Sequence, residues 1–326
     1  MSENFKCGAV AVLGKPNVGK STLTNLLVGQ KISIVSDKKQ TTRKQIRGIV
    51  TTDEYQIVLI DTPGLHEPHT TLQKVMNEDA QASLADVDLV LVVVDAHQKP
   101  DKEDEALASL LKKAWKYPWA EEDAEAHRLK LSPSDPSEEA KAVRPFNGVL
   151  LCLNKMDLLK AEDVVDRVED YCKLFGTDAY MLTCLTKRQN YEKLLALITD
   201  HLQEGEALFP EDMVTDSPMR FMAAELIREK ALALTRQEVP HSIGCVVDHW
   251  EETNGKTTII ASLICEKDGQ KAILIGKKGA MAKEIGTLAR AEIEDLLEAQ
   301  VFLELHVKVR PEWRQNPRML HELDYM

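Results

Sequence analysis

The residues best suited to chemistry stand near the N-terminus, where Gly14–Ser21 reads GKPNVGKS. The pattern G-x-x-x-x-G-K-S is complete, and it lies between an apolar run, Ala9–Leu13, and a segment of helical periodicity, Lys20–Val28. A glycine-rich turn at a helix N-terminus can surround phosphate groups with backbone N–H groups. Lys20 would reach the β- and γ-phosphates of a nucleoside triphosphate, and the Ser21 hydroxyl would bind Mg²⁺. An ordinary turn between a strand and a helix is the alternative.

Two further motifs each follow an apolar run. Asp61-Thr62-Pro63-Gly64 comes after the run that ends at Ile60, where a carboxylate can hold a Mg²⁺-bound water and a glycine N–H can contact a γ-phosphate. Asn154-Lys155-Met156-Asp157 comes after the run that ends at Leu153. Asp157 can accept hydrogen bonds from N1–H and the 2-amino group of guanine, a donor pair that adenine lacks. Each motif alone could be a turn, but three in this order at strand ends predict a guanine-nucleotide site.

The pattern between these motifs predicts the fold that positions them. Apolar strands alternate with amphipathic helices over residues 1–204, which is typical of an α/β domain with a mostly parallel sheet and helices on both faces. Ile46–Thr51 is expected to add an edge strand. The expected strands are Ala9–Leu13, Tyr55–Ile60, Leu89–Val94 and Gly148–Leu153, and the expected helices are Lys20–Val28, Leu72–Leu84, Glu103–Ala114, Ala161–Phe175 and Tyr191–Leu202.

Composition shifts divide the rest of the chain. Residues 205–218, bracketed by prolines, predict a linker, so we expect one domain over 1–204 and a second domain with a C-terminal tail over 219–326. Residues 117–145 have little apolar periodicity and predict a surface insertion, which is either a tolerated loop or a regulatory docking loop. The second domain has the expected order α-β-β-α-α-β, which is an α+β module.

Charge and hydropathy limit the class of protein. The 326 residues have a net charge of −12, so nonspecific binding of nucleic acid by the whole chain is not expected, and neither is DNA as a partner. Residues 217–326 hold 15 basic and 17 acidic residues, which leaves room for a local basic face. Neither a membrane span nor a secretory signal is expected. The six scattered cysteines are typical of small buried side chains in a reducing cytosol, and a metal or redox role for Cys172 and Cys184 is the minor alternative.

A second candidate site lies in the C-terminal module, where Ile275–Gly279 reads IGKKG between two helical segments. Two glycines that flank two lysines allow a tight turn and a close approach of backbone amides to a sugar-phosphate chain, as in the clamp of the K-homology fold. A helix C-cap followed by a turn is the alternative. Lys283 and Arg290, seven residues apart on one helix face, would extend the basic rim, or they simply form a solvated face. The candidate RNA-binding residues are Gly276, Lys277, Lys278, Gly279, Lys283 and Arg290.

On these motifs the chain resembles the translation-factor-like GTPases, and over its whole length it resembles the Era family of ribosome-assembly GTPases. Family-like segments in the second half are Arg220–Lys230, Glu238–Pro240 and Leu303–Val309. The resemblance implies a P-loop GTPase domain followed by a type II K-homology domain, with GTP or GDP and Mg²⁺ bound. The nucleotide-binding residues that it implies are Gly14, Lys15, Pro16, Asn17, Val18, Gly19, Lys20, Ser21, Thr22, Asp61, Thr62, Pro63, Gly64, Leu65, Asn154, Lys155, Met156, Asp157, Thr183, Cys184 and Leu185.

Gln40-Thr41-Thr42-Arg43 resembles the first switch of that family, in which a threonine binds Mg²⁺ and the γ-phosphate. Thr42 is the expected residue and Thr41 the second choice. The resemblance implies that Asn17 helps to bind a K⁺ ion that stands in for an arginine finger, although asparagine is also a common turn residue. The implied Mg²⁺ ligands are Ser21, Thr42 and Asp61, and the implied catalytic residues are Lys20, Thr42, Gly64 and Asn17.

Three positions depart from the related enzymes. Leu65 stands where Ras-like enzymes have the glutamine that orients the attacking water, so turnover by the isolated protein is expected to be slow. Thr183-Cys184-Leu185 replaces the usual Ser-Ala-x of the guanine-binding loop, which puts the nucleotide affinity in question more than its specificity. His306 occupies a position where relatives often have tryptophan, so one base-stacking contact is in question.

The resemblance implies a GTP-hydrolysing switch that binds the 3′ end of 16S ribosomal RNA and assists 30S subunit biogenesis. It implies a cytoplasmic monomer with peripheral contact to the inner face of the cell membrane. Two other functions stay open at this point. One is an RNA-binding chaperone in which GTP is a structural ligand, which Leu65 favours, and the other is a membrane-associated signalling GTPase whose C-terminal module binds protein.

Overall fold

The computed structural model describes residues 4–36, 38, 41–64, 70–82, 84, 87–114, 148–235, 242–253 and 255–326. The predicted insertion at 117–145, Gln40, Leu65 and Glu238–Pro240 lie outside the described residues. The chain forms two compact units, and each unit is built from segments that are separated in the sequence. Met1–Ser33, Gln45–His66 and Met76–Asp216 belong to the first unit, and Ile34–Lys44, Glu67–Val75 and Ser217–Met326 belong to the second.

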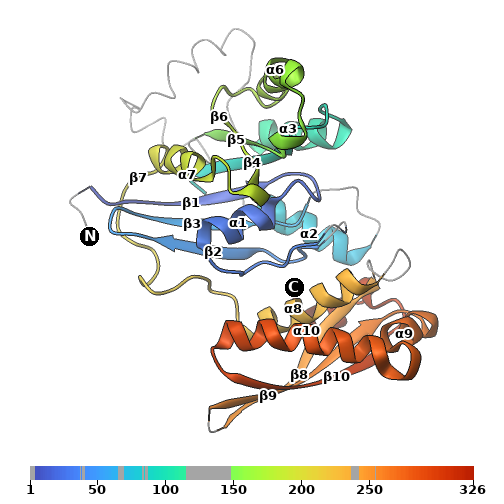
Figure 1. Ribbon diagram of the computed structural model, residues 1–326. Helices are drawn as coiled ribbons and strands as arrows, with labels where there is room; N and C mark the ends of the chain where they lie inside the picture. Colours follow the sequence, from blue (N-terminus) through green and yellow to red (C-terminus); the bar gives the residue numbers. More distant parts are fainter. Residues whose placement is uncertain are drawn as a thin grey trace. The chain divides into compact units, whose positions relative to one another are not determined.

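A sheet of seven described strands forms the centre of the first unit (Figure 1). Its order is β2-β3-β1-β4-β5-β6, and β7 pairs with β1. The neighbours β1–β3, β1–β4, β4–β5 and β5–β6 are parallel, whereas β2 is an antiparallel edge strand next to β3, as predicted. The strands are β1 (Lys6–Leu13), β2 (Ile46–Thr51), β3 (Tyr55–Asp61), β4 (Leu89–Asp95), β5 (Val149–Asn154), β6 (Tyr180–Leu182) and β7 (Gln203–Glu204).

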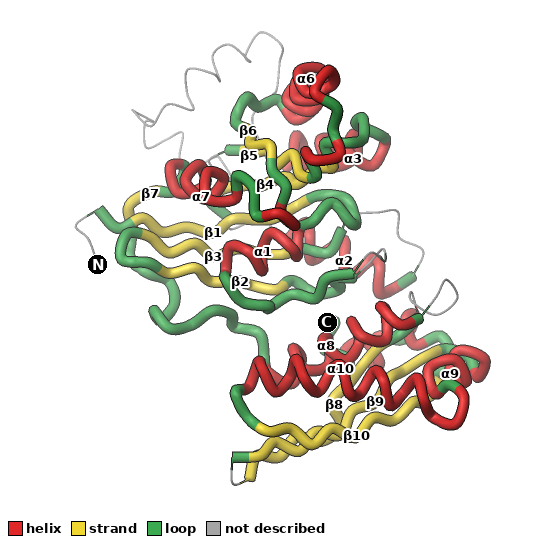
Figure 2. The backbone as a smooth tube through the Cα atoms, viewed as in Figure 1, coloured by secondary structure: helices red, strands yellow, loops and turns green. Residues whose placement is uncertain are grey.

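Helices pack on both faces of this sheet because its central strands are apolar on both sides. In β4, Val90, Val92 and Val94 belong to the core that contains residues of α3 and α6, whereas Leu89, Leu91 and Val93 belong to the core that contains residues of α1 and α7. These helices alternate with the strands along the chain, and Figure 2 shows the helices in red next to the strands in yellow. The predicted α/β fold class is therefore confirmed. The helices are α1 (Lys20–Val28), α2 (Thr71–Ala82), α3 (Lys102–Ala114), α6 (Val164–Phe175) and α7 (Tyr191–Asp200).

The second unit has the predicted order α-β-β-α-α-β, with a three-stranded sheet in the order β10-β9-β8. β10 is parallel to β9, and β8 is antiparallel to it. The long helices supply the apolar core, which includes Ile227, Ile285 and Ile293. The elements are α8 (Met219–Leu234), β8 (Gly244–Thr253), β9 (Lys256–Cys265), α9 (Asp268–Ile275), α10 (Ala280–Leu297) and β10 (Gln300–Val309).

The residues after β10 fold back onto this unit. A 3₁₀ turn at Trp313–Gln315 and a short helix, α11 (Pro317–Glu322), bury Trp313 and Tyr325. The Trp313 indole N–H donates to the Ser242 carbonyl oxygen at 2.9 Å. The sequence predicted only a tail here, because six helical residues are too few to show a periodic pattern.

Two other details differ from the predicted elements. The strands β6 and β7 were not predicted, because runs of three and two residues carry no alternation that a sequence can display. Much of the predicted linker lies along the first unit: the Leu208 and Phe209 N–H groups donate to Gln56 Oε1, and Thr215 forms a bridge with Gly48 of β2.

Candidate functional site

The phosphate loop, Gly14–Ser21, connects β1 to α1 with a backbone that requires its glycines. Gly14 and Gly19 have positive φ angles of 150° and 111°. A Cβ atom on Gly14 would lie 2.3 Å from the Val93 carbonyl oxygen, and one on Gly19 would lie 2.5 Å from Asn154 Nδ2. The N-cap of α1 is Gly19, which has no side chain that could cap the helix. The N-terminus of α1 thus carries the positive end of the helix dipole at the phosphate loop, as an anion site needs.

Lys20 lies inside this loop with 7% of its surface exposed. Its ammonium donates to the carbonyl oxygens of Gly14 and Lys15, both at 3.0 Å. Burial lowers the pKa of Lys20 to about 8, and the nearby Asp61 carboxylate acts in the opposite direction. Both of these acceptors are neutral carbonyl groups, so a polyphosphate would add a stronger, charge-assisted interaction to the buried ammonium.

Asp61 ends β3 as a fully buried carboxylate. Among the described residues, neither of its oxygens accepts a hydrogen bond of ordinary geometry. Burial raises its pKa, and Lys20 together with the Ser21 and Ser33 hydroxyls lowers it. A buried carboxylate with such unmatched oxygens is costly unless a cation or its water completes it. Asp61 and Ser21 therefore fit a Mg²⁺ site.

The rest of the Asp61–Gly64 motif is fixed against the same loop. The Thr62 hydroxyl donates to the Val12 carbonyl oxygen at 2.8 Å. A Cβ atom on Gly64 would lie 2.9 Å from Pro16 Cγ and 3.0 Å from the Pro16 nitrogen. Gly64 is therefore the residue that allows the two motifs to touch.

Asn154 joins the guanine-binding loops to the phosphate loop. Its amide nitrogen donates to the Val18 carbonyl oxygen at 2.8 Å. Its amide oxygen accepts from the Leu185 N–H at 3.1 Å and from the Thr183 hydroxyl at 3.5 Å. One side chain thus fixes the positions of three motifs that are far apart in the sequence.

Asp157 lies partly exposed, with 23% of its side chain accessible, and Lys187 Nζ is 3.0 Å from Oδ2. Hydrogen bonds from the Cys184 and Lys187 side chains lower its pKa. The carboxylate is therefore ionised at neutral pH and reachable by a ligand, as recognition of two guanine donors requires.

The structure brings together Gly14–Ser21, Asp61–Gly64, Asn154–Asp157 and Thr183–Leu185 in the first unit. Thr41 and Thr42 belong instead to the segment 34–44 of the second unit, so the predicted Mg²⁺ role of Thr42 stays a prediction. Asn17 has φ of 65°, a left-handed conformation that asparagine tolerates. This fits its role as a turn residue, and its K⁺ role also stays a prediction.

The segment 34–44 is fixed within the second unit by contacts that the sequence did not reveal. The Arg43 guanidinium donates to the Ile243 carbonyl oxygen at 2.6 Å and lies over the rings of Trp313 and Tyr325, 5.4 and 5.6 Å from their centroids. Arg228, which pairs with Glu225, also donates to the Thr41 carbonyl oxygen. Burial lowers the pKa of Arg43 to about 10. These charged and aromatic groups come from three distant parts of the chain, so no spacing in the sequence indicates that they meet.

The glycine-lysine loop forms a tight turn between α9 and α10. Gly276 has φ of 70°, and a Cβ atom there would lie 2.7 Å from Met281 Cβ. Gly279 and Lys278 also have positive φ angles, 80° and 53°. Lys277 and Lys278 are exposed, and so are Lys283 and Arg290 on α10. The structure thus presents a backbone turn with exposed cations, and its RNA-binding role stays a prediction.

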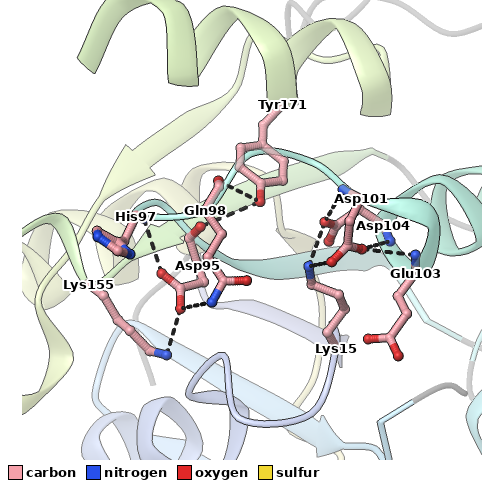
Figure 3. Close-up of polar contacts among 9 residues, drawn as sticks. All are labelled: Lys15, Asp95, His97, Gln98, Asp101, Glu103, Asp104, Lys155 and Tyr171. Atoms are coloured by element: carbon pink, nitrogen blue, oxygen red, sulfur yellow. Dashed lines mark hydrogen bonds and ion pairs between the residues drawn. The ribbon is translucent and has the colours of Figure 1, made fainter. Parts of the chain in front are cut away.

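Three acidic residues that the sequence analysis did not single out contact the nucleotide loops (Figure 3). Lys15 Nζ lies 2.8 Å from Asp101 and 2.7 Å from Asp104, and Lys155 Nζ lies 2.7 Å from Asp95. One signal was present in the sequence, because Asp95 directly follows an apolar strand, just as Asp61 does.

Some broader expectations concern the chain as a whole. Within the described ranges, no helix is both long and apolar enough to cross a bilayer, and no three His, Cys, Asp or Glu side chains gather as a metal cluster. All six cysteines are free thiols; Cys7 and Cys172 are half-buried and the others are buried.

Comparison with known proteins agrees with both halves of this description. Residues 9–120 match the family model described as 50S ribosome-binding GTPase, and residues 238–314 match the KH domain model. The GTPase Era of Ruminiclostridium cellulolyticum is 40% identical over 323 residues, which are 99% of this chain and 98% of that protein. Two crystal structures, each 36% identical with a TM-score of 0.80, cover 98% of this chain and 99% of their own. One is Era in complex with MgGDPNP and nucleotides 1506–1542 of 16S ribosomal RNA, and the other is a variant of Aquifex aeolicus Era bound to GDP·AlF₄⁻.

Proposed function

Because the chain belongs to the Era family of GTPases, we propose that it hydrolyses GTP and uses the bound nucleotide to control an RNA-binding K-homology domain. The observation that carries the first half is the network around Asn154, which holds the phosphate loop at Val18 and the guanine loop at Leu185. Lys20 of the phosphate loop and Asp61 at the end of β3 are both buried, which is the arrangement that a nucleoside polyphosphate with a divalent cation requires.

In this proposal the chain contributes positioning and charge rather than covalent chemistry. Lys20 and the loop N–H groups stabilise the negative charge that develops on the transferred phosphoryl group. Ser21, Asp61 and Thr42 would hold Mg²⁺, which would neutralise negative charge on the phosphates. Gly64 donates its N–H to the γ-phosphate. With leucine at position 65, the attacking water has no glutamine to orient it, so we expect slow basal turnover that K⁺, bound with the help of Asn17, accelerates.

The RNA ligand that we propose is the 3′ end of 16S ribosomal RNA, with 30S subunit biogenesis as the role. The relative that binds nucleotides 1506–1542 of that RNA is similar to this chain over nearly its whole length. The turn at Gly276–Gly279 supports the proposal, because its glycines leave the backbone open to a sugar-phosphate chain while Lys277 and Lys278 stay exposed. A cytoplasmic monomer with peripheral membrane contact belongs to the same proposal and rests on the family alone.

The segment 34–44 supports the coupling of nucleotide to RNA. It carries Thr42, the expected γ-phosphate ligand, and its neighbour Arg43 is held within the second unit by Ile243, Trp313 and Tyr325. In this proposal Thr42 binds the nucleotide and the adjacent Arg43 binds the second unit. Loss of the γ-phosphate would then change the position of Arg43, and RNA binding would change that of Thr42.

Turnover of GTP tests the enzymatic half. We expect hydrolysis to be slow in Na⁺ and to rise roughly ten- to a hundredfold in K⁺ with the ribosomal RNA fragment, since K⁺ would supply the charge stabilisation that an arginine finger gives in other GTPases. Phosphate release should be measured with each addition separately and with both together. Turnover no faster than buffer in every condition would leave GTP as a structural ligand of an RNA chaperone.

Charge reversal at the turn tests the RNA half. Lys277→Glu/Lys278→Glu should weaken binding of the 16S fragment at least about tenfold, because two phosphate contacts are lost. The plot of log affinity against log salt should become less steep, its negative slope shrinking in magnitude by about 1.4. Lys160→Glu/Lys193→Glu, an equal charge change at exposed positions of the first unit, serves as the control. Equal binding by parent and clamp variant would contradict the clamp. An RNA affinity identical with GDP and GDPNP would contradict the coupling.

A further inference from the structure

The connection between β4 and α3 holds one lysine from each nucleotide loop. We use the name β4–α3 connection for residues 95–104, which run from the last residue of β4 to the first turn of α3. At one end Asp95 binds Lys155 of the guanine loop, and at the other Asp101 and Asp104 bind Lys15 of the phosphate loop (Figure 3). We propose that Asp95 and Asp104 are positioning residues, Asp95 for recognition of the guanine base and Asp104 for binding of the phosphates. This inference rests on the proposed guanine-nucleotide function.

Asp95 is placed by the sheet itself. β4 and β5 are parallel neighbours in which Asp95 pairs with Asn154, and the Ala96 N–H donates to the Asn154 carbonyl oxygen at 2.8 Å. The Asp95 side chain is 7% exposed, and its Oδ1 accepts from the His97 N–H at 3.1 Å. Its Oδ2 is thus directed at the Lys155 ammonium, 2.7 Å away. A partly buried, charge-assisted pair of this length fixes the lysine side chain in one position.

Lys155 in turn controls where Asp157 lies. Lys155 has φ of 62° and ψ of 33°, a left-handed conformation that a residue with a side chain rarely adopts. The short 3₁₀ turn that carries Asp157 begins immediately after it, at Met156–Leu158. An ion pair that holds Lys155 in this conformation therefore holds the turn, and with it the carboxylate that would accept the two guanine donors. Without Asp95 the loop is free to relax toward ordinary backbone angles.

Asp104 acts on the other loop by a similar chain of contacts. Its side chain is 1% exposed, and its Oδ1 accepts no hydrogen bond among the described residues. Burying a carboxylate with one unmatched oxygen lowers the stability of the fold. The ion pair with Lys15 offsets part of that loss. The Lys15 carbonyl oxygen is one of the two acceptors that hold the Lys20 ammonium. Asp104 therefore orients the lysine that is expected to contact the phosphates.

The connection is stiff enough to serve both ends. The Tyr171 hydroxyl, fully buried on α6, lies 3.4 Å from the Asp95 carbonyl oxygen and 3.2 Å from that of Gln98. The Asp101 N–H donates to Asp104 Oδ2 at 3.0 Å, which closes the start of α3. The Tyr171 contacts join the connection to α6 and the Asp101–Asp104 bond closes its other end, so both carboxylates are positioned by hydrogen bonds of the surrounding fold.

The two roles predict different effects on two ligands. GDP and IDP differ only in the 2-amino group that Asp157 would accept from, and they carry the same phosphates. Asp95→Asn keeps an acceptor for the His97 N–H but loses the charge that holds Lys155. We expect it to lower the ratio of GDP to IDP affinity roughly tenfold, as for a lost charge-assisted hydrogen bond. Asp104→Asn is the matched variant, in which Lys15 keeps Asp101, and it should weaken both ligands by the same factor.

The measurement is the dissociation constant of each ligand by calorimetry, with thermal melting of the nucleotide-free proteins in parallel. If Asp95→Asn does not fold, Asp95→Ser, which can still accept from the His97 N–H, takes its place. A folded variant at position 95 with the parental GDP to IDP ratio would overturn the inference, and so would an equal loss for both ligands, which indicates a merely structural role. A parent protein that binds neither ligand would instead refute the proposed function.

Discussion

Asp157→Asn is expected to lose affinity for GDP by a factor on the order of 10³, because an amide cannot accept both guanine donors and its own N–H group would face one of them. The same variant should gain affinity for XDP. Xanthine has an N1–H donor and a C2 carbonyl acceptor, which match the mixed acceptor and donor of asparagine. Competition of GDP and XDP against a fluorescent guanine nucleotide measures both changes.

The control for this exchange is Asp166→Asn, the same change at an exposed position of α6. It should leave both affinities unaltered. If Asp157→Asn bound GDP as tightly as its parent, the residue would not be the base-recognition carboxylate. The Asn154-Lys155-Met156-Asp157 motif would then be a turn and nothing more.

Lys20→Ala is expected to weaken GDP at least about a hundredfold, since truncating one partner of a buried charge pair costs several kcal/mol. The wild-type protein should also show a particular pH dependence. The pKa of Lys20 is about 8 because of burial, and bound phosphates raise it by favouring the ammonium. Binding then takes up a proton above pH 8, so affinity should fall about tenfold between pH 7 and pH 9.

Calorimetry at several pH values checks both statements. Lys20→Ala provides the internal control, because any residual pH dependence in that variant comes from the ligand or from other groups. Lys160→Ala, which removes a lysine that is 75% exposed, should match the parent at every pH. A parent curve parallel to that of Lys20→Ala would show that this ammonium does not contact the phosphates.

The nucleotide site could be predicted closely because its parts are local. In a parallel α/β sheet, the carboxyl ends of the strands lie on the same side of the sheet. Motifs that directly follow three parallel strands must therefore converge there. Asn154 shows this convergence directly through its bonds to Val18 and Leu185. The role of the glycines could be predicted for the same reason, since the positive φ of Gly14 and Gly276 depends only on the turn that each residue makes.

The contacts between distant segments could not be predicted in this way. Asp95 and Asp104 carried no motif, although Asp95 stood at the end of a predicted strand. The C-terminal residues Trp313 and Tyr325 were assigned only to a tail, yet they enclose the Arg43 side chain. Arg43 lies more than two hundred residues before Trp313 and Tyr325 in the chain. Periodic patterns in a sequence predict local structure only, so they do not indicate such pairs.

The amino-acid sequence by itself determined the two folds, the order of their elements and the residue types that face a guanine nucleotide, because hydrophobic period and turn chemistry act over a few neighbouring residues. The tertiary structure alone decided that residues 34–44 belong with the second unit and that the β4–α3 connection holds both nucleotide loops. The physical reason is that a buried charge must find its partner wherever packing brings one within hydrogen-bond distance. Arg43 finds its partners two hundred and more residues further along the chain, a pairing that exists only once both segments are folded.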